Sequence, residues 1–390
     1  MRLKGKSKMF ETGGKPIRKK PIRRKSDSWN EVESAEDILA DIFSRVPVKS
    51  LLVSKSVSKH WHRLIQSPAF INLQLRWSLE KPNYIIYPYM DEVVNLYLMK
   101  GNGEIIEMIT LPGCENLPPL SLICSRNGLI CCINYPLVPD SDDEVYLIDF
   151  EIRICNPATR EVYLLPQGSP SKKKISIGVA FGPKPWEYKV FRFFHFKSEA
   201  EDTRLECEIY SSSTGSWRGI GVVQHCPMDY EHCPLGSNHI FVNGKVYWFV
   251  SSEEDDDIPG FILSVDMEEN FRIINLPEEV TQHSSLVDLE GCLSLVAVYD
   301  EDEIVDVWVL DDSNEPNWKK KRSDYVPFSS NECIDSVAAL KNEIFFITTD
   351  HYLIYNLDDG TWTELDLADD FERNLPVVFP YTESLLPCKY

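Results

Sequence analysis

The residues that could carry out chemistry in this sequence lie in two short clusters. His225-Cys226 and His232-Cys233 form two His-Cys pairs seven residues apart. A zinc site needs four converging nitrogen or sulfur ligands, and the Cys-x-x-Cys spacing typical of such sites is absent here. The acidic run EEDDD at 253–257 offers oxygens of the kind that calcium prefers, but without EF-hand spacing. We therefore predict no metal site, no cofactor, and a solvated acidic loop at 253–257.

Motifs of the common catalytic sites are missing from the sequence. No G-x-S-x-G, H-E-x-x-H, P-loop or complete G-x-G-x-x-G occurs. Acidic residues are plentiful, but none forms a pair whose spacing indicates acid–base catalysis. The sequence therefore predicts a protein that is not an enzyme. A propeller enzyme or small-molecule binder stays open as an alternative, and it would need a funnel of converging polar side chains.

Length and composition predict a globular protein of the nucleus or cytoplasm, or both. The chain has 390 residues, of which 43% are hydrophobic and 11% aromatic, enough for a large buried core. No apolar run approaches the length of a membrane span, and no signal-peptide pattern opens the chain, so we expect no membrane contact. Its eleven cysteines are irregularly spaced, which favours buried thiols in a reducing compartment over a disulfide framework.

The charge of the chain is unevenly distributed. Residues 1–25 carry eleven Lys or Arg and one Glu, whereas the whole chain has a net charge of −21, so the remainder is near −31. A segment so basic and so poor in apolar residues predicts a disordered arm at 1–33. The acidic body argues against a nucleic-acid-binding domain. The candidate nuclear-import residues are Arg18, Lys19, Lys20, Arg23, Arg24 and Lys25.

Three helical patterns follow one another between residues 34 and 79, and these elements position the first candidate binding site. Ser34 with Asp37 approximates a capping box, and Val46-Pro47 ends the first helix. A second amphipathic pattern runs from Leu51 to Ile65, and Ser67-Pro68 opens a third helix. About 45 residues bury too little surface for comfortable stability alone. The apolar residues left over predict either a partner helix or packing onto the downstream domain.

The string EDILADIFSRVPVKSLL…VSKHWHRLIQSPAFI resembles an F-box, the helical module that docks a Skp-type adaptor of a cullin–RING ubiquitin ligase. Two departures from the plant pattern remove apolar contact area: Ser34-Ala35 replaces Leu-Pro, and Ser54 and Ser56 replace an aromatic residue and a cysteine. A binding module outside the ligase therefore remains an alternative. The resemblance implies that the adaptor-binding residues are Ile38, Leu39, Ile42, Phe43, Pro47, Leu51, Leu52, Val57 and Trp61.

From about residue 83 the pattern changes to short alternating β segments. Four dipeptides predict type I′ hairpins, namely Asn102-Gly103, Asn127-Gly128, Asn243-Gly244 and Asp359-Gly360. Six similar hairpin units end in an apolar or aromatic position, at Met108, Tyr163, Trp217, Phe271, Trp318 and Trp362, which lie 55, 54, 54, 47 and 44 residues apart. Spacing near 50 residues is typical of a four-stranded propeller blade.

The repeats predict a large all-β domain at 80–390 with the architecture of a six-bladed β-propeller, and a β-sandwich is the alternative. With the three-helix domain before it, the predicted fold class is α+β multidomain. A ring of blades closes most simply when a terminal strand completes the first blade, so residues 377–381 should pair with residues 84–87. Several polar and aromatic positions could form a ligand surface, but we interpret most of them as core. They are Asn156, Trp186, Tyr188, Trp217, Trp248, Trp308 and Trp318.

The β region also resembles the F-box-associated domain of plant F-box proteins. The strings that carry this resemblance include ICNPATREVYLLP, VAFGPKPWEYKVFRF, VNGKVYWFV and FPYTESLLP, in that order. Kelch glycine doublets are missing, so the units are not kelch repeats in the strict sense. Together the two resemblances imply an F-box domain at 34–79 and a substrate-recruiting domain at 80–390. They imply a receptor that binds the adaptor, through it cullin and RING subunits, and an unknown protein target.

Overall fold

The computed structural model describes residues 36–88, 95–111, 120–134, 151–171, 175–197, 203–227, 239–252, 258–277, 280–281, 283–299, 302–312, 315–329, 332–367 and 376–389. The described residues are divided between two units, with the boundary between Phe43 and Ser44. The predicted boundaries at 33/34 and 79/80 stay predictions. In the described part of the chain, no helix is both long and apolar enough to cross a membrane.

Four short helices precede the strands. Helical backbone at 36–44 is followed by α2 (Val48–Ser54), α3 (Lys59–Ile65) and α4 (Pro68–Leu79). The predicted single helix from Leu51 to Ile65 is therefore two helices, because Ser58 has extended backbone and its side chain accepts a hydrogen bond from the backbone N–H of Trp61. The predicted start at Ser67-Pro68 is confirmed, since the Ser67 side chain caps α4 through the N–H of Phe70.

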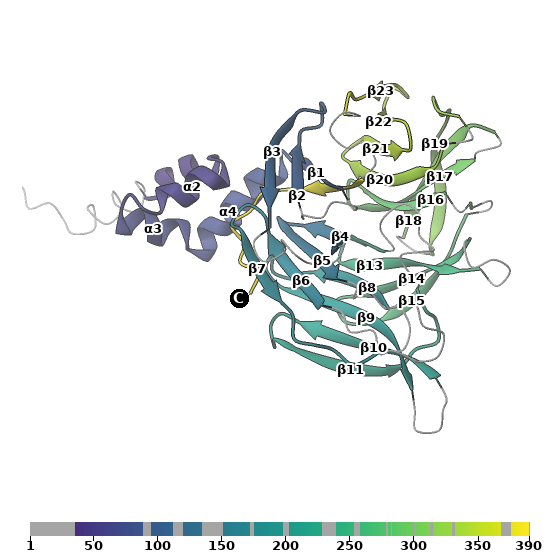
Figure 1. The fold of residues 1–390 in the computed structure, drawn as a ribbon, viewed down its shortest axis with the longest axis horizontal. Helices are drawn as coiled ribbons and strands as arrows, with labels where there is room; N and C mark the ends of the chain where they lie inside the picture. The colour runs from purple at the N-terminus through teal and green to yellow at the C-terminus, as the bar shows by residue number, and fades with distance from the viewer. Residues whose placement is uncertain are drawn as a thin grey trace, which may run out of the picture. The chain divides into compact units, whose positions relative to one another are not determined.

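Six antiparallel four-stranded sheets form the rest of the described fold (Figure 1). We call them blades 1 to 6. Blade 1 contains β24 (Pro376–Tyr381), β1 (Asn83–Pro88), β2 (Asn95–Met99) and β3 (Ile105–Thr110); blade 2 contains β4 (Leu120–Arg126), β5 (Leu129–Asn134), β6 (Glu151–Asn156) and β7 (Glu161–Leu164). Blade 3 contains β8 (Ser176–Phe181), β9 (Tyr188–Lys197), β10 (Thr203–Ser211) and β11 (Ser216–Val222).

Blades 4 to 6 repeat the same order. Blade 4 contains β12 (His239–Val242), β13 (Lys245–Ser251), β14 (Pro259–Asp266) and β15 (Phe271–Asn275). Blade 5 contains β16 (Ser284–Leu289), β17 (Cys292–Tyr299), β18 (Ile304–Asp311) and β19 (Asn317–Tyr325). Blade 6 contains β20 (Ile334–Leu340), β21 (Glu343–Thr348), β22 (Tyr352–Asn356) and β23 (Trp362–Glu364).

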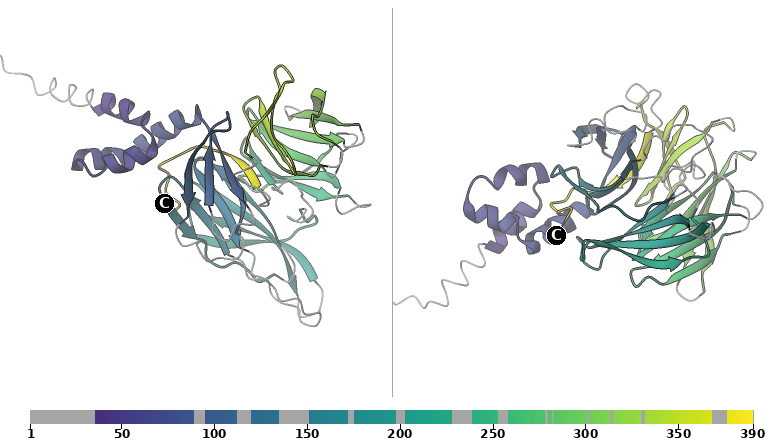
Figure 2. Two further views of the ribbon diagram at one scale, coloured as in Figure 1. Left: turned by 45° about the horizontal axis from the view of Figure 1, so that its top comes forward. Right: turned by 60° about the horizontal axis from the view of Figure 1, so that its bottom comes forward.

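The six inner strands β24, β4, β8, β12, β16 and β20 contact one another in a closed ring (Figure 2). The predicted six-bladed propeller is confirmed, and the sandwich alternative is wrong. All six residues of β8 are buried, whereas the outer strand β11 has no buried residue. Apolar clusters lie between neighbouring blades and join blade 1 to 2, 3 to 4, 4 to 5, 5 to 6 and 6 to 1. The core is therefore a set of inter-blade layers.

The predicted closure of the ring is also confirmed. β24 pairs with β1 in antiparallel register, with Ile86 opposite Val378 and Tyr87 opposite Val377. The chain beyond β24 then runs against blades 2 and 3. The side chain of Asn156, which is fully buried, donates hydrogen bonds to the carbonyl oxygens of Ser384 at 3.1 Å and Leu386 at 2.7 Å. Asn156 is thus a structural residue that holds the C-terminal segment.

The six hairpin ends predicted from the sequence all lie on the outermost strands of the blades. Three of them are tryptophans whose indole N–H donates to a backbone carbonyl of the preceding blade or the residues just after it. Trp217 binds Pro166 O at 2.7 Å, Trp318 binds Asn275 O at 2.8 Å and Trp362 binds Tyr325 O at 3.1 Å. The three tryptophans therefore join neighbouring blades from the outer strands, where their side chains are half-buried rather than part of the fully buried core.

Two of the four predicted type I′ turns have the required backbone. Asn127-Gly128 and Asn243-Gly244 have positive φ at both residues and form two-residue loops. The prediction is wrong for Asn102-Gly103 and Asp359-Gly360, where only the glycine has positive φ. The reason is loop length, since these dipeptides lie within five-residue connections from β2 to β3 and from β22 to β23.

Candidate functional site

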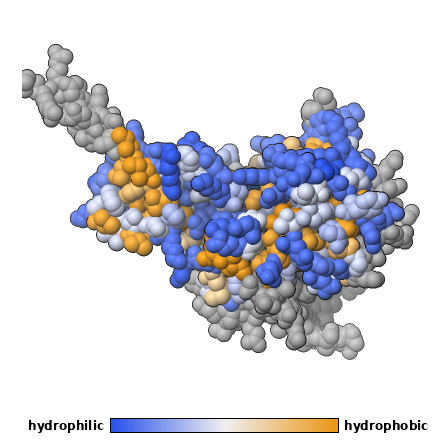
Figure 3. All heavy atoms as spheres, turned by 90° about the horizontal axis from the view of Figure 1, so that it is seen from above, coloured by the Kyte–Doolittle hydropathy of each residue, from blue (hydrophilic) through white to orange (hydrophobic). Residues whose placement is uncertain are grey.

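Exposed apolar side chains gather on the helical segment (Figure 3). Val53 at the end of α2 is 68% exposed, and Val57 in the turn before α3 is 63% exposed. Of the predicted adaptor-binding residues nearby in the sequence, Leu52 and Trp61 are half-buried and Pro47 is exposed. Exposed aliphatic side chains have no favourable contact with water, so this surface is suited to a partner.

Leu51, one of the predicted adaptor-binding residues, is buried. Its side chain is 0% exposed, together with Val48 and Ile65, so it supports the helices from inside and offers no surface to a partner in this arrangement. Val53 is not among the predicted adaptor-binding residues, because that prediction follows the family pattern and not the geometry of the helix. A signal was available, since Val53 lies off the apolar face formed by Val48, Leu51 and Leu52. An apolar residue on the outer face of a helix is a candidate contact.

The helix at 36–43, in the first unit, carries its own exposed apolar pair. Ile38 is 60% exposed and Ile42 is 55% exposed, and their i, i+4 spacing places them on one helical face. Leu39 is half-buried, and Phe43 is buried. Ile38 and Ile42 therefore remain available to a partner, whereas Phe43 does not. Whether any of the nine residues binds an adaptor stays a prediction.

Polar contacts tie α2 and α4 to the propeller. Lys49 Nζ lies 2.7 Å from Glu107 Oε1 on β3, and Gln74 Nε2 lies 3.5 Å from the backbone oxygen of Glu383. Burial raises the pKa of the Glu383 carboxyl, the Glu107 carboxylate adds to the rise, and Lys49 and the N–H of Val48 oppose it. A separate bond joins Lys341 Nζ to the carbonyl of Glu80, at 3.2 Å, just after α4. The helices from α2 onward thus share one compact unit with the blades.

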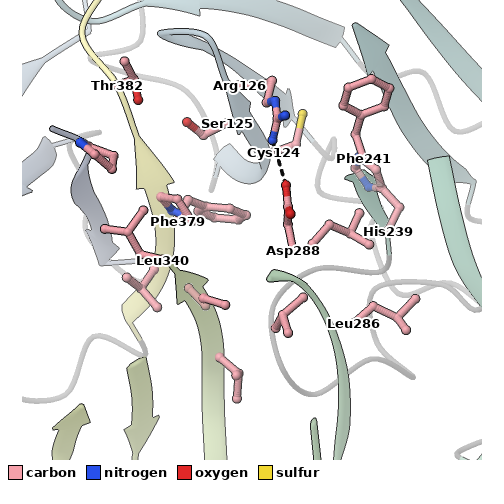
Figure 4. Close-up of a pocket in the computed structure, with 18 of the residues that line it drawn as sticks. Cys124, Ser125, Arg126, His239, Phe241, Leu286, Asp288, Leu340, Phe379 and Thr382 are labelled. Atoms are coloured by element: carbon pink, nitrogen blue, oxygen red, sulfur yellow. Dashed lines mark hydrogen bonds and ion pairs between the residues drawn. The ribbon is translucent and has the colours of Figure 1, made fainter. Parts of the chain in front are cut away.

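A cavity of about 310 Å³ lies at the centre of the propeller (Figure 4). It is lined by all six inner strands, with aliphatic and aromatic side chains such as Leu286 and Phe379. Arg126 Nη1 and Asp288 Oδ2 form an ion pair 2.9 Å apart in its wall. The two charges of this pair offset one another, and the lining also includes the charged residues Glu290 and Lys341.

The other candidate residues of the sequence have varied outcomes. The import residues at 18–25, the acidic run at 253–257, Ser34, Ala35 and the pair His232-Cys233 lie outside the described residues. Among the residues that the structure does describe, no group of three or more His, Cys, Asp or Glu side chains could hold a metal ion. Trp248 and Tyr188 are buried core residues.

Comparison with protein families now bears on these features. The F-box domain profile matches residues 36–73, the helical segment with its exposed apolar side chains. The profile described as the F-box associated beta propeller domain matches residues 109–358, most of the six blades. This chain belongs to the F-box-associated β-propeller family. Both resemblances predicted from the sequence are confirmed, and the order of F-box and propeller is the predicted one.

Curated relatives agree with the family assignment. The F-box protein At5g49610 of Arabidopsis thaliana is 23% identical over 388 residues, covering 90% of this chain and 97% of the relative. The F-box protein CPR1 of the same plant is 25% identical over 309 residues, covering 73% of this chain and 71% of the relative. Among solved structures, the match to the tricorn protease covers 75% of this chain and 34% of the protease chain, at 7% sequence identity and a TM-score of 0.39. A TM-score this low supports no statement about function.

Proposed function

We propose that this protein is a substrate-recognition subunit of an SCF-type cullin–RING ubiquitin ligase and catalyses no reaction itself. The F-box segment binds a Skp-type adaptor, and through it the cullin and RING subunits. The propeller binds a target protein. Holding the target near the ubiquitin-charged enzyme raises the effective concentration of the two reactants.

The exposed apolar surface of the F-box segment carries this proposal. Val53 and Val57 leave more than half of their surface open to water although the fold has ample apolar core to bury them in. Truncating a hot-spot residue at a protein interface commonly costs about 2 kcal/mol or more of binding free energy. The polar contacts of Lys49 and Gln74 with the propeller support a fixed spacing between adaptor and target.

Adaptor binding by the full chain tests the proposal. We expect the wild-type protein to bind a purified Skp-type adaptor in calorimetry or a pull-down. Val53→Glu and Val57→Glu should each weaken binding at least about tenfold, because a buried carboxylate without a partner is strongly unfavourable. Val222→Glu is the matched control, since Val222 is 63% exposed on β11 of the propeller. Its adaptor affinity should equal that of the wild type.

Leu51→Ala requires a different measurement. Because the side chain is buried, this substitution should lower the free energy of unfolding by roughly 2–5 kcal/mol. Weaker adaptor binding by this variant alone would therefore be ambiguous, since it could come from unfolding. A wild-type chain that is folded and does not bind the adaptor would contradict the proposal and favour a binding module outside the ligase. Unchanged affinity in both Val53 and Val57 variants would contradict the assigned surface and leave the adaptor role in place.

We also propose that the basic arm at 1–25 directs the protein to the nucleus, whereas without it the protein stays in the cytoplasm. The support is compositional, since Arg18, Lys19 and Lys20 are followed closely by Arg23, Arg24 and Lys25. Deletion of residues 1–25 should reduce nuclear accumulation of a fluorescently tagged chain without changing its thermal unfolding. An unchanged distribution would refute the import role.

A further inference from the structure

Two cysteines beside the central cavity form a chemically distinctive pair. Cys124 on β4 and Cys131 on β5 lie directly opposite one another in the antiparallel register, and both thiols are free. Cys124 lines the cavity and is partly exposed, whereas Cys131 is fully buried. The cavity of about 310 Å³ has room for a small reagent beside Cys124, whose side chain is partly exposed.

A histidine from another blade lies at the same cavity as Cys124. His239 on β12 also lines the cavity (Figure 4), and its hydrogen bond with Cys124 helps to lower the pKa of that thiol. Its Nε2 accepts a hydrogen bond from the backbone N–H of Val179 at 3.2 Å. With Nε2 acting as an acceptor, a neutral ring carries its proton on Nδ1, which is then its donor. The ring is thus held in the tautomer that can donate to the sulfur of Cys124.

The two thiols differ in acidity for physical reasons. Burial opposes ionisation of Cys124, but hydrogen bonds with Cys131 and His239 outweigh it and bring the pKa of Cys124 below the ordinary thiol value. Burial raises the pKa of Cys131, and the neighbouring Cys124 raises it further. One sulfur therefore ionises readily while its neighbour retains a proton, and the thiolate is the nucleophilic form.

We propose that Cys124 and Cys131 form a hydroperoxide-reactive dithiol site within the propeller. The Cys124 thiolate attacks one oxygen of the hydroperoxide, an S–O bond forms, and the O–O bond breaks. The leaving hydroxide or alkoxide takes up a proton to give water or an alcohol, and Cys124 becomes a sulfenic acid. The sulfur of Cys131 then attacks that of Cys124, the S–O bond breaks, and the thiol proton of Cys131 passes to the leaving hydroxyl, which departs as water. The two cysteines lose two electrons together, and the hydroperoxide gains them.

The geometry of the hairpin permits the disulfide. Directly opposed residues of an antiparallel pair have Cα atoms about 4.5–5.5 Å apart. A disulfide spans about 4.4–6.8 Å between Cα atoms, a range that includes this spacing, and the register of β4 and β5 shifts between Leu122 and Cys124, just before the pair. Cys132 follows Cys131 and points to the opposite face of the strand, where it packs in the apolar layer between blades 1 and 2. Cys132 is therefore the matched control for Cys131.

The first test uses the unaltered full chain. The reduced protein is pulse-labelled at neutral pH with iodoacetamide, and the labelling rate of each cysteine is measured by peptide mass spectrometry. An ordinary thiol is only a few per cent ionised at neutral pH, so Cys124 should react about tenfold faster than the exposed Cys292. Labelling of Cys124 no faster than that of Cys292 would overturn the proposal without reliance on any variant.

The second test follows the disulfide. An equimolar dose of hydrogen peroxide should link Cys124 to Cys131 in the wild type and in Cys132→Ser, and dimedone should trap a sulfenic acid at Cys124 in Cys131→Ser. His239→Gln should slow oxidation of Cys124 several-fold, with folding of each variant checked by circular dichroism. Peroxide-induced links confined to the exposed Cys226, Cys292 and Cys333, or equal oxidation with and without His239, would overturn the proposal.

Discussion

Removal of the closing strand should unfold the whole propeller rather than loosen one end. A chain that stops after residue 370 lacks β24 and the C-terminal segment. Six large apolar side chains there are buried, namely Val377, Val378, Phe379, Tyr381, Leu385 and Leu386. Each buried side chain of this size contributes about 1.5–3 kcal/mol, so the set contributes roughly 10 kcal/mol or more. A typical domain has only about 5–15 kcal/mol of net stability.

The truncated chain also loses hydrogen bonds, which destabilises it further. Without β24 the backbone of β1 loses its partner along six residues, and Asn156 loses the carbonyls that satisfy its buried amide. An unpaired buried polar group typically costs about 1–3 kcal/mol. Phe379→Ala is a graded version of the change, expected to cost about 3 kcal/mol, near the lower end of the range because Phe379 borders the cavity.

Urea denaturation followed by circular dichroism and tryptophan fluorescence measures the effect. We expect the truncated chain to lack a cooperative transition and to be digested rapidly by protease, whereas deletion of residues 1–33 should leave the transition unchanged. A synthetic peptide of residues 376–389, added in trans, should restore protease resistance. The reasoning is refuted if the truncated chain unfolds cooperatively at the wild-type midpoint.

Two further changes test the packing and the electrostatics of the blades. Gly178→Ala would place a Cβ 2.0 Å from Cζ2 of Trp248, so it should lower the unfolding free energy by about 1–3 kcal/mol or more in urea denaturation, whereas Gly219→Ala, with open space around it, should not. The hydrogen bond that the protonated His351 ring donates to the Glu332 carboxylate raises the pKa of His351 above its ordinary value of 6.5. The stabilisation from this ion pair is present below pH 6.5 and is lost as the pH rises through the raised pKa. It should amount to at most about 1 kcal/mol of unfolding free energy. Urea unfolding measured across pH should show this dependence in the wild type and not in His351→Gln.

Local patterns in the sequence were sufficient to predict the architecture. Each blade ends in a hairpin with an apolar or aromatic residue, and the repeat of that residue from Met108 to Trp362 allowed the six units to be counted. The pairing of residues 377–381 with the first blade followed from the need to pair backbone groups at an open edge. Turn type was predicted less well, because the dipeptides Asn102-Gly103 and Asp359-Gly360 lie in longer loops, where the type I′ backbone is not required.

The sequence alone therefore determined the family, the number of blades and the way in which the ring closes, because these depend on short motifs and their spacing. Tertiary structure decided which F-box side chains face outward: Leu51 and Val53 are both aliphatic residues of α2, yet one is buried and the other exposed. It also decided that His239 of blade 4 meets Cys124 of blade 2, with the Val179 backbone of blade 3 orienting the ring. That encounter exists only because closure of the ring brings inner strands distant in sequence around one axis, and no local pattern encodes it.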